Sequence, residues 1–239
     1  GELGFAQYLR KDGLSYRLVP VANKFPQANW VTDQKLREYK LGGTSIRDNN
    51  TDVLYENLMN KFAFGGANKK GVYFDEENRR HILNIREVYA EAAGNMADLG
   101  RKDEASKLID KVQNGIPDET LPFGMTSRYN SHNQTSLILL EACYKAGKMD
   151  EAEKVRKVLR KDLEQQQRYY EWIRSNRPEL YGAFEDSEVP INERILLVLG
   201  DLEKKYAPQT QPQPKVEGNA PTIINGAGKP DSNGSKPQQ

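Results

Sequence analysis

Two stretches of the chain spell the same turn between two helices. They read Leu99-Gly100-Arg101-Lys102-Asp103-Glu104-Ala105 and Ala146-Gly147-Lys148-Met149-Asp150-Glu151-Ala152. In each stretch an alanine follows a glycine by five residues, which is the spacing of the inter-helix turn in tetratricopeptide repeats. The glycine lets the first helix end in a left-handed conformation, and the alanine lets the two helices approach closely. The repeated turn therefore predicts a mainly α fold of tetratricopeptide-like antiparallel helical hairpins.

The two copies do not fit the repeat equally well. In the first copy Tyr89 and Met96 fill large helix positions, and Pro117 lies where the repeat normally closes. In the second copy Ser136 replaces the early large residue, and Glu164 lies where a proline is expected. A pair of generic antiparallel hairpins explains the same pattern, so that alternative stays open.

Helical periodicity extends from Phe74 to Tyr206. Apolar residues at three- and four-residue steps predict a helix ending at Gly100 and a second one capped by Asp103. After a loop, the pattern predicts a helix ending at Gly147 and a long helix capped by Asp150. The buried stripe of that long helix is expected to be Ala152, Val155, Leu159, Leu163, Gln166, Tyr170 and Ile173. A last helix is expected to begin near Pro190, because proline is favoured in a first turn.

The chain divides by composition into three regions. Residues 1–72 are predicted to form an irregular α/β segment with one short strand, Ser15–Val21, and one helix from Thr51 or Asp52 to Gly65-Gly66. The strand has no evident partner in the sequence and would be unstable alone. Residues 73–206 are predicted to form the helical domain. Residues 207–239 hold half of the twelve prolines and are predicted to be a disordered tail, because they cannot bury enough apolar area.

Charge and cysteine content exclude several functions. The 35 Lys and Arg residues balance 34 Asp and Glu residues, so no global field attracts nucleic acid or an anionic membrane. The single cysteine, Cys143, rules out an intrachain disulfide and is expected to be a buried apolar residue. His132 is expected at a helix start as part of a cap. A hydrolytic site would need Asp75 or Glu77 to converge with His81, and we expect no such site, no metal and no cofactor.

The repeat frame predicts which residues would face a protein partner. The concave face would be formed by Glu87, Ala90, Gly94 and Ala97 from the first hairpin and by Gln134, Leu137, Glu141 and Tyr144 from the second. These residues lack the Lys and Asn cluster that would clamp the C-terminal carboxylate of a peptide. An extended segment or a neighbouring domain is therefore the expected occupant.

A rival interpretation is a carbohydrate-binding accessory domain. Its stacking platforms would be Trp30, Tyr169, Tyr170 and Trp172. Exposure distinguishes the two interpretations, because a sugar platform must face solvent whereas helical spacing alone would place about half of these rings in the core.

Three segments resemble a known group of proteins. They are Gly13-Leu14-Ser15-Tyr16-Arg17-Leu18-Val19-Pro20-Val21, Asn57-Leu58-Met59-Asn60-Lys61-Phe62 and Gly71-Val72-Tyr73-Phe74-Asp75. In this order, ahead of tetratricopeptide-like helices, they resemble the C-terminal soluble region, a domain of unknown function, of large bacterial membrane proteins typical of the Bacteroidetes. The similarity covers about Gly4 to Pro117.

The resemblance implies a function and a location. In that group the membrane half is similar to protein O-mannosyltransferases, and the soluble region is expected at the periplasmic face of the inner membrane. It therefore implies a non-catalytic accessory domain of a glycosyltransferase-like protein. The implied partner is another protein or the membrane half of the same polypeptide, with no nucleic acid and no direct membrane insertion. No catalytic residue carries over, because none of the membrane half is present.

Overall fold

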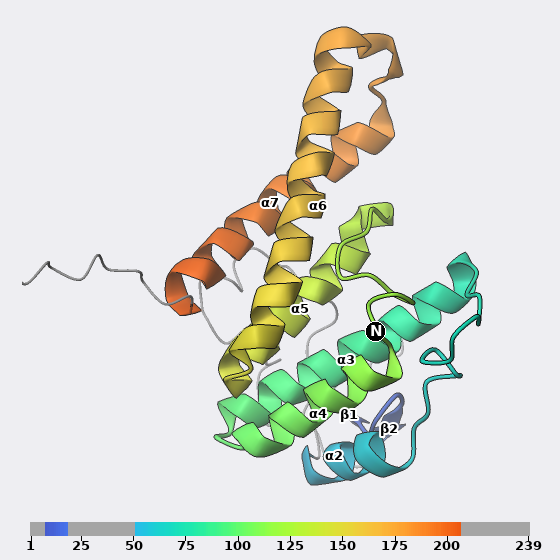
Figure 1. Cartoon of the computed structure of the whole chain (residues 1–239), viewed down its shortest axis with the longest axis vertical. Helices are drawn as coiled ribbons and strands as arrows, with labels where there is room; N and C mark the ends of the chain where they lie inside the picture. Colours follow the sequence, from blue (N-terminus) through green and yellow to red (C-terminus); the bar gives the residue numbers. More distant parts are fainter. Residues whose placement is uncertain (1–7, 19–50, 207–239) are drawn as a thin grey trace, which may run out of the picture. The chain divides into compact units, whose positions relative to one another are not determined.

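The computed structural model describes residues 8–18 and 51–206, and within these ranges the fold is mainly α. All described residues belong to one compact unit. The helices are α2 (Thr51–Asn60), α3 (Glu76–Asp98), α4 (Lys102–Gly115), α5 (Ser131–Ala146), α6 (Met149–Asn176) and α7 (Ala183–Tyr206) (Figure 1). Two short 3-10 helices, η2 (Arg128–Asn130) and η3 (Pro178–Leu180), precede α5 and α7.

The repeated turn joins two antiparallel hairpins, α3–α4 and α5–α6. Gly100 and Gly147 end the first helix of each hairpin at φ values of 80° and 79°, in the left-handed region that glycine adopts at low cost. Ala105 and Ala152 have no exposed surface and lie where the paired helices meet. The sequence prediction of antiparallel helical hairpins is therefore confirmed.

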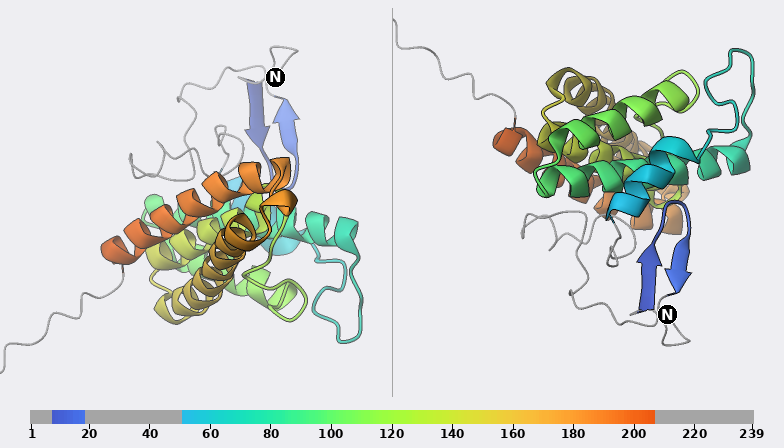
Figure 2. Two further views of the ribbon diagram at one scale, coloured as in Figure 1. Left: turned by 90° about the horizontal axis from the view of Figure 1, so that it is seen from above. Right: turned by 90° about the horizontal axis from the view of Figure 1, so that it is seen from below.

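The hairpins stack through α3 and α5, which pack against each other along their lengths, and α7 covers the outer side of α5 and α6 (Figures 1 and 2). The predicted stripe of α6 is confirmed, because its buried residues are Ala152, Val155, Leu159, Leu163, Gln166, Tyr170 and Ile173. Side chains from all the helices named above join one core, including Leu54 and Leu58 of α2. The proposed boundary near residue 72 stays a prediction.

The strand predicted near residues 15–21 pairs with a second strand of the chain. Strand β2 (Tyr16–Leu18) pairs antiparallel with β1 (Leu9–Lys11), so the expectation of an unpaired strand was wrong (Figure 2). The partner was missed because β1 is only three residues long. The turn between the strands is tied to α2 by the amide of Asn57, which donates to Oδ1 of Asp12 at 3.2 Å.

Several helix boundaries differ from the prediction. Asp103 and Asp150 lie inside the first turns of α4 and α6 rather than capping them, since the caps are Arg101 and Lys148. Helix α7 begins at Ala183 and includes Pro190. Because proline has no backbone N–H, the helix lacks one backbone hydrogen bond at this position.

Three further observations bear on the sequence predictions. Cys143 is fully buried, as expected, and burial raises the pKa of its thiol to about 12. Among the described helices, none combines the length and apolar character that crossing a membrane requires. The predicted tail, residues 207–239, lies outside the described residues.

Candidate functional site

Two adjoining cavities, of about 430 and 440 Å³, lie beside the first turns of α3 and α5. Both are lined by Arg79 and Met125, so we treat them as one feature and call it the basic groove. Its walls are the start of α3, the segment of residues 69–74, the loop from Pro117 to Asn130, and the start of α5. Its charged lining residues are Lys69, Lys70, Arg79, Arg80 and Arg128, opposed by Glu76 and Glu119.

The first wall is the beginning of α3. Asp75 caps the helix, because its carboxylate accepts the backbone N–H of Asn78 at 2.8 Å. Arg79 donates from Nε to the carbonyl of Phe74 at 3.0 Å and thereby holds the approaching segment against the helix. Arg80 pairs with Glu76 at 2.6 Å, so part of its charge is neutralised. The remaining cations give this wall its positive character.

A buried arginine shapes the second wall. Arg86 is 1% exposed, and its guanidinium donates to the carbonyls of Ile116 at 3.2 Å, Leu121 at 2.6 Å and Pro122 at 3.4 Å. It also lies 5.0 Å from the centre of the Phe123 ring. Burial lowers the pKa of Arg86 to about 10. One side chain of α3 therefore fixes the course of the loop from residue 116 to 123.

His132 fastens the same loop from α5. Its Nε2 lies against the carbonyl oxygen of Pro122, which can only accept, so Nε2 carries the proton and donates. The side chain has no exposed surface, and burial lowers its pKa to about 4. The backbone N–H of His132 donates to the hydroxyl of Ser127 at 2.9 Å. The helix-start prediction placed His132 correctly, but Ser127 supplies the cap.

The turn before α5 is strained. Tyr129 and Asn130 have φ values of 56° and 49°, in the left-handed region that residues with a side chain rarely adopt. The backbone N–H of Tyr129 donates to the carboxylate of Glu188 in α7 at 2.5 Å, and the carbonyl of Tyr129 accepts from Gln134 at 2.7 Å. Strain of this kind persists only where surrounding contacts impose it.

Buried amides impose the conformation of this turn. The side-chain amide of Asn130 donates to Gln166 in α6 at 3.2 Å and to Asn192 in α7 at 3.3 Å. Asn133 donates to Asn130 at 2.8 Å and to Asp162 at 2.7 Å. All four amide residues are at most 6% exposed. We call these residues, with Glu188, the amide network.

The loop also needs a glycine. A Cβ at Gly124 would lie 2.8 Å from Cβ of Asp162 and 2.9 Å from the carbonyl oxygen of Val158, both in α6. The contact brings the loop directly onto the backbone of α6. Together with Arg86 and the amide network, it gives Ser127 and Arg128 fixed positions at the groove.

The groove is suited to binding anions. It combines five cationic side chains with two carboxylates, and α3 and α5 both direct their positive N-terminal ends towards it. Guanidinium groups and hydroxyls bind carboxylates through charge-assisted hydrogen bonds. Leu83, Val72 and Pro122 add apolar surface. A bound segment could therefore present acidic and apolar side chains together.

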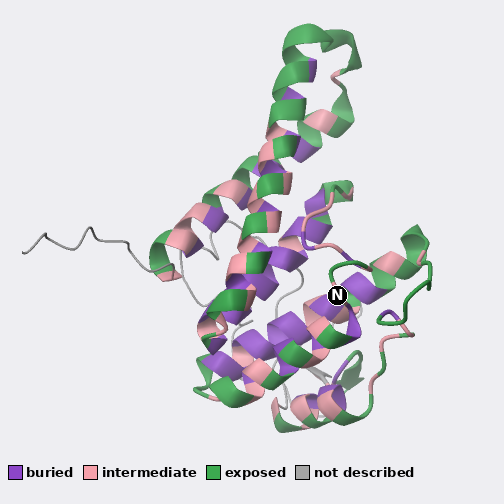
Figure 3. Cartoon of the chain, in the orientation of Figure 1, coloured by how far each residue is buried: buried purple, intermediate pink, exposed green. Residues whose placement is uncertain are grey.

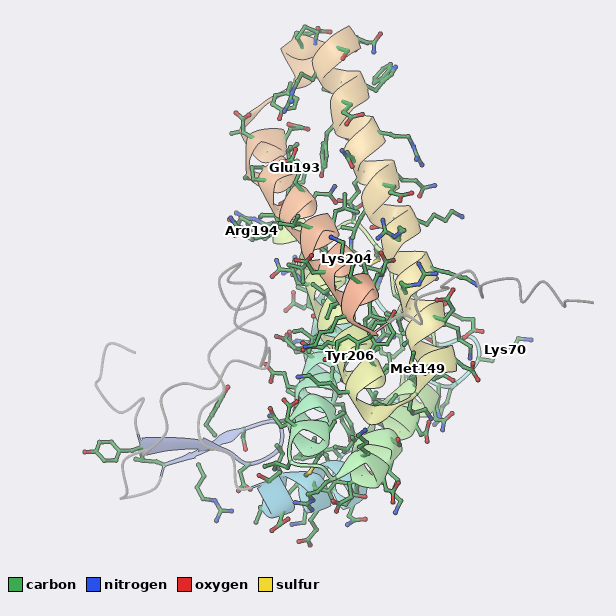
Figure 4. All side chains as sticks on the ribbon, turned by 90° about the vertical axis from the view of Figure 1, so that its left-hand side faces the viewer. Lys70, Met149, Glu193, Arg194, Lys204 and Tyr206 are labelled. Atoms are coloured by element: carbon green, nitrogen blue, oxygen red, sulfur yellow. The ribbon has the colours of Figure 1, made fainter. Side chains whose placement is uncertain are left out.

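The predicted concave face lies mostly inside the molecule. Its buried members are Ala90, Gly94, Ala97, Leu137, Glu141 and Tyr144, while Glu87 and Gln134 are half-buried. Tyr144 stacks on Tyr206 at the end of α7, with ring centres 5.1 Å apart and planes 9° apart. Tyr206 is labelled in Figure 4. Glu141 pairs with Lys145 at 3.1 Å. A partner would have to displace α7 to reach Tyr144, so that face is not available in this conformation.

The predicted stacking residues divide by burial. Tyr169 and Trp172 are both 54% exposed, whereas Tyr170 is 4% exposed and packs towards α7. Trp30 lies outside the described residues. The hydrolytic trio also does not converge in a cleft. Asp75 caps α3, and His81 lies 3.6 Å from Glu77 on the exposed surface of the same helix.

Sequence reasoning missed most of the groove. Arg79, Arg86 and Arg128 carried no local signal, because their roles depend on loops more than 30 residues away or on cavity shape. The helix predicted to end at Gly65-Gly66 ends earlier, at Asn60, and Gly65, Gly66 and Gly71 follow it with φ values of 60°, 78° and 84°. In the sequence, the polar residues Ser127, Asn130 and Ser131 at the start of α5 indicated a helix cap there, but not the groove beside it.

Comparisons with known proteins add no further identification. No model of a known protein family, no curated protein and no solved structure matches the chain. In the part of the chain that the structure describes, no three His, Cys, Asp or Glu side chains lie close enough to hold a metal ion.

Proposed function

We propose that this chain is a non-catalytic interaction domain that binds an extended, acidic segment of a protein in the basic groove. The observation that carries the proposal is the concentration of charge. A chain with a formal net charge of +1 places five cations and two carboxylates around two joined cavities. Opposite charges at such a surface attract and orient a partner during association.

The groove matches a polypeptide better than a compact ligand. Its two cavities share Arg79 and Met125, and one is also lined by Lys70 and the other by Ser131. An extended segment places alternate side chains on opposite sides. Acidic side chains would reach the guanidinium groups while apolar ones meet Leu83 and Pro122.

Preorganisation supports the same proposal. The amide network, Arg86 and His132 hold the loop in place without a ligand, and they hold Tyr129 and Asn130 in a strained conformation. A binding surface that is already ordered loses less conformational entropy on association. Such strain concentrates at functional sites.

Peptide binding tests the proposal directly. A fluorescein-labelled peptide of alternating Glu and Leu is titrated with the protein by fluorescence anisotropy, in parallel with a Lys-Leu peptide of the same length. We expect only the acidic peptide to bind, with an affinity that falls as salt rises. The double variant Lys70→Glu/Arg128→Glu should weaken binding at least about tenfold, because two attractive contacts become repulsive.

A matched charge change controls for net charge. Lys102 in α4 and Lys161 in α6 are exposed and do not line the groove. The variant Lys102→Glu/Lys161→Glu therefore alters net charge equally and should bind as the unaltered protein does. Equal binding of both peptides, or equal losses in both double variants, would reject the groove as the site.

The family resemblance suggests where such a domain would act and what it would bind. The domain would then serve a larger glycosyltransferase-like membrane protein at the periplasmic face, and the groove would hold an acceptor protein or a segment of the membrane half. A photo-crosslinking residue in place of Thr126, which lines the groove, tests this in native envelopes. Adducts to a discrete protein support recruitment, adducts to the same polypeptide support an internal contact, and no adduct opposes both.

A further inference from the structure

We propose that the outer face of α6, near its C-terminal end, binds a neutral oligosaccharide. The site consists of Gln165, Tyr169, Trp172 and Asn176, which we call the aromatic stripe. It is separate from the basic groove and does not depend on the function proposed for it.

Helical geometry places the four side chains on one line. Their spacing of four, three and four residues keeps them on one face of a helix. Tyr169 and Trp172 are each 54% exposed, and Gln165 and Asn176 are also exposed. The stripe therefore presents two aromatic rings flanked at each end by an amide.

The stripe lies on a part of α6 that extends beyond the hairpin stack. Helix α6 has 28 residues whereas α5 has 16, so its C-terminal part extends past α5 and lies beside α7 and η3 (Figure 1). Burial falls along this part of the helix, and its end is almost wholly exposed (Figure 3). No other element named above covers the stripe.

The rings are held in position by neighbouring contacts. Tyr169 packs edge-on against the buried Tyr170, with ring centres 5.6 Å apart and planes 62° apart. The side-chain amide of Asn176 donates to the carbonyl of Trp172 at 2.9 Å. Below them, Arg174 donates to the hydroxyl of Tyr181 at 2.8 Å and closes the turn into α7. The Tyr169 ring is thus in contact with a buried ring before a ligand arrives.

Charge at this end of the molecule favours a neutral ligand. Residues 168–186 contain three arginines and four carboxylates, Arg168, Arg174, Arg177, Glu171, Glu179, Glu185 and Asp186. This near balance gives no attraction to nucleic acid or to an anionic membrane, both of which need excess positive charge. The basic groove, with its excess of cations, shows the opposite arrangement.

The exposed aromatic rings alone do not supply the area of an interface with a second copy of the chain. A fully covered Tyr, Phe or Trp buries about 150–250 Å², so Tyr169, Trp172 and the half-exposed Phe184 together offer roughly 300 Å². A stable protein interface needs about 800 Å² from each partner. The same area suits a ligand of one or two rings.

Sugar chemistry fits the order of groups along the stripe. A pyranose has an apolar face of C–H groups, which stacks on an aromatic ring, and hydroxyls at its edge, which bond to amides. Tyr169 and Trp172 are separated by about 4.5 Å along the helix axis, so adjacent rings of a linear glycan can each meet one of them. The amide groups of Gln165 and Asn176 can then donate to and accept from the hydroxyls at both ends.

Saturation-transfer NMR with defined sugars tests the proposal. The probes are linear hexasaccharides of glucose, of mannose and of N-acetylglucosamine, and the protein is the full chain. We expect transfer to the ring protons of at least one probe. Trp172→Ala and Tyr169→Ala should each weaken its binding by about two- to tenfold, from the worth of one stacked ring.

Two further measurements make the result decisive. The chain has two tryptophans, so a Trp30→Phe background makes Trp172 the sole tryptophan, and its fluorescence should change saturably with the bound sugar. Tyr16, a 42% exposed tyrosine in β2 that lines neither the groove nor the stripe, supplies the control variant Tyr16→Ala, which should bind normally. No transfer to any probe, or equal losses in Tyr16→Ala, overturns the proposal. So does concentration-dependent dimerisation, measured by sedimentation velocity, that Trp172→Ala abolishes.

Discussion

The two ends of α5 are held by different kinds of interaction. At its C-terminal end, Gly147 turns the chain at a φ of 79° and Ala152 packs without exposed surface against the preceding helix. At its N-terminal end, Tyr129 and Asn130 turn the chain in the same left-handed region without any glycine. The first turn uses residues suited to the conformation, whereas the second forces unsuited residues into it.

The origin of the stabilising contacts explains the difference. The turn at Gly147 is complete within seven residues of sequence. The turn at Asn130 depends on partners 36, 59 and 62 residues away, in α6 and α7. The groove is built on the second kind of turn, so its shape depends on tertiary packing while the hairpin does not. Four experiments test this contrast.

The largest effect is expected from Arg86→Leu. The substitution leaves the carbonyls of Ile116, Leu121 and Pro122 without their buried donor. Each buried acceptor left without a donor costs about 1–3 kcal/mol, so the free energy of unfolding should fall by at least about 3 kcal/mol. Urea unfolding followed by circular dichroism measures it. A loss below about 1 kcal/mol would mean that the loop is held by other contacts.

The next effect tests the hairpins themselves. Ala105→Trp and Ala152→Trp force a large ring between helices that meet at fully buried alanines. Overpacking of this kind costs roughly 1–3 kcal/mol. The same substitution at Ala183, which is exposed at the start of α7, should change stability little and serves as a control. Thermal unfolding curves unchanged by both buried substitutions would count against close helix contact at these alanines.

The hairpins could be predicted from the sequence because the residues that determine them are close together in the chain. The seven-residue turn and the stripe from Ala152 to Ile173 need only helical periodicity and small residues at fixed spacing. The α7 boundary was wrong for a related reason. Pro190 signals a first turn, but the packing of Glu188 and Asn192 on the α5 turn extends the helix back to Ala183.

The sequence could not predict the groove. Arg86 looks like one more exposed helical cation until the loop carbonyls are placed around it, and Asn130 looks like a helix cap although its side chain makes no capping bond. The concave face was placed by analogy with an open repeat array, whereas Tyr206 closes over Tyr144. Aromatic exposure was left open by the sequence, because the helical period fits both a core and a surface position for Tyr169.

The third experiment measures how the free energy of unfolding depends on pH, because His132, which fastens the loop, should contribute a change of about 2 kcal/mol. Burial lowers the pKa of His132 to about 4, whereas an unfolded histidine titrates near about 6.5. Between these values the unfolded chain binds a proton that the folded chain does not, so stability falls as the pH drops below 6.5. From pH 7 to pH 5 the free energy of unfolding should fall by about 2 kcal/mol.

Two variants isolate this contribution. His132→Gln keeps a donor for the carbonyl of Pro122 and removes the titration of this histidine, so its stability should not fall between pH 7 and pH 5. His81→Gln alters an exposed histidine and should keep the full dependence. Burial raises the pKa of Glu141, which stabilises the folded chain as pH falls and opposes the effect of His132 in every variant alike. Parallel curves for all three proteins would show that His132 is not the titrating group.

The smallest effects on stability are expected from one substitution in each turn, Gly147→Ala and Tyr129→Gly. At Gly147 an added Cβ meets nothing within 4 Å, so Gly147→Ala adds only backbone strain, about 1 kcal/mol. Tyr129→Gly removes similar strain but gives the unfolded chain more conformational freedom, so stability should change by less than about 0.5 kcal/mol. Tyr129 is 52% exposed, and its side chain contacts Arg128, whose guanidinium donates to the Tyr129 hydroxyl at 3.2 Å. The two variants are compared by urea unfolding and by affinity for the acidic peptide.

If the strained turn orders the groove, Tyr129→Gly should weaken peptide binding while Gly147→Ala leaves it unchanged. A large loss of stability in Tyr129→Gly would instead show that its side chain, and not the contacts from α6 and α7, maintains the turn.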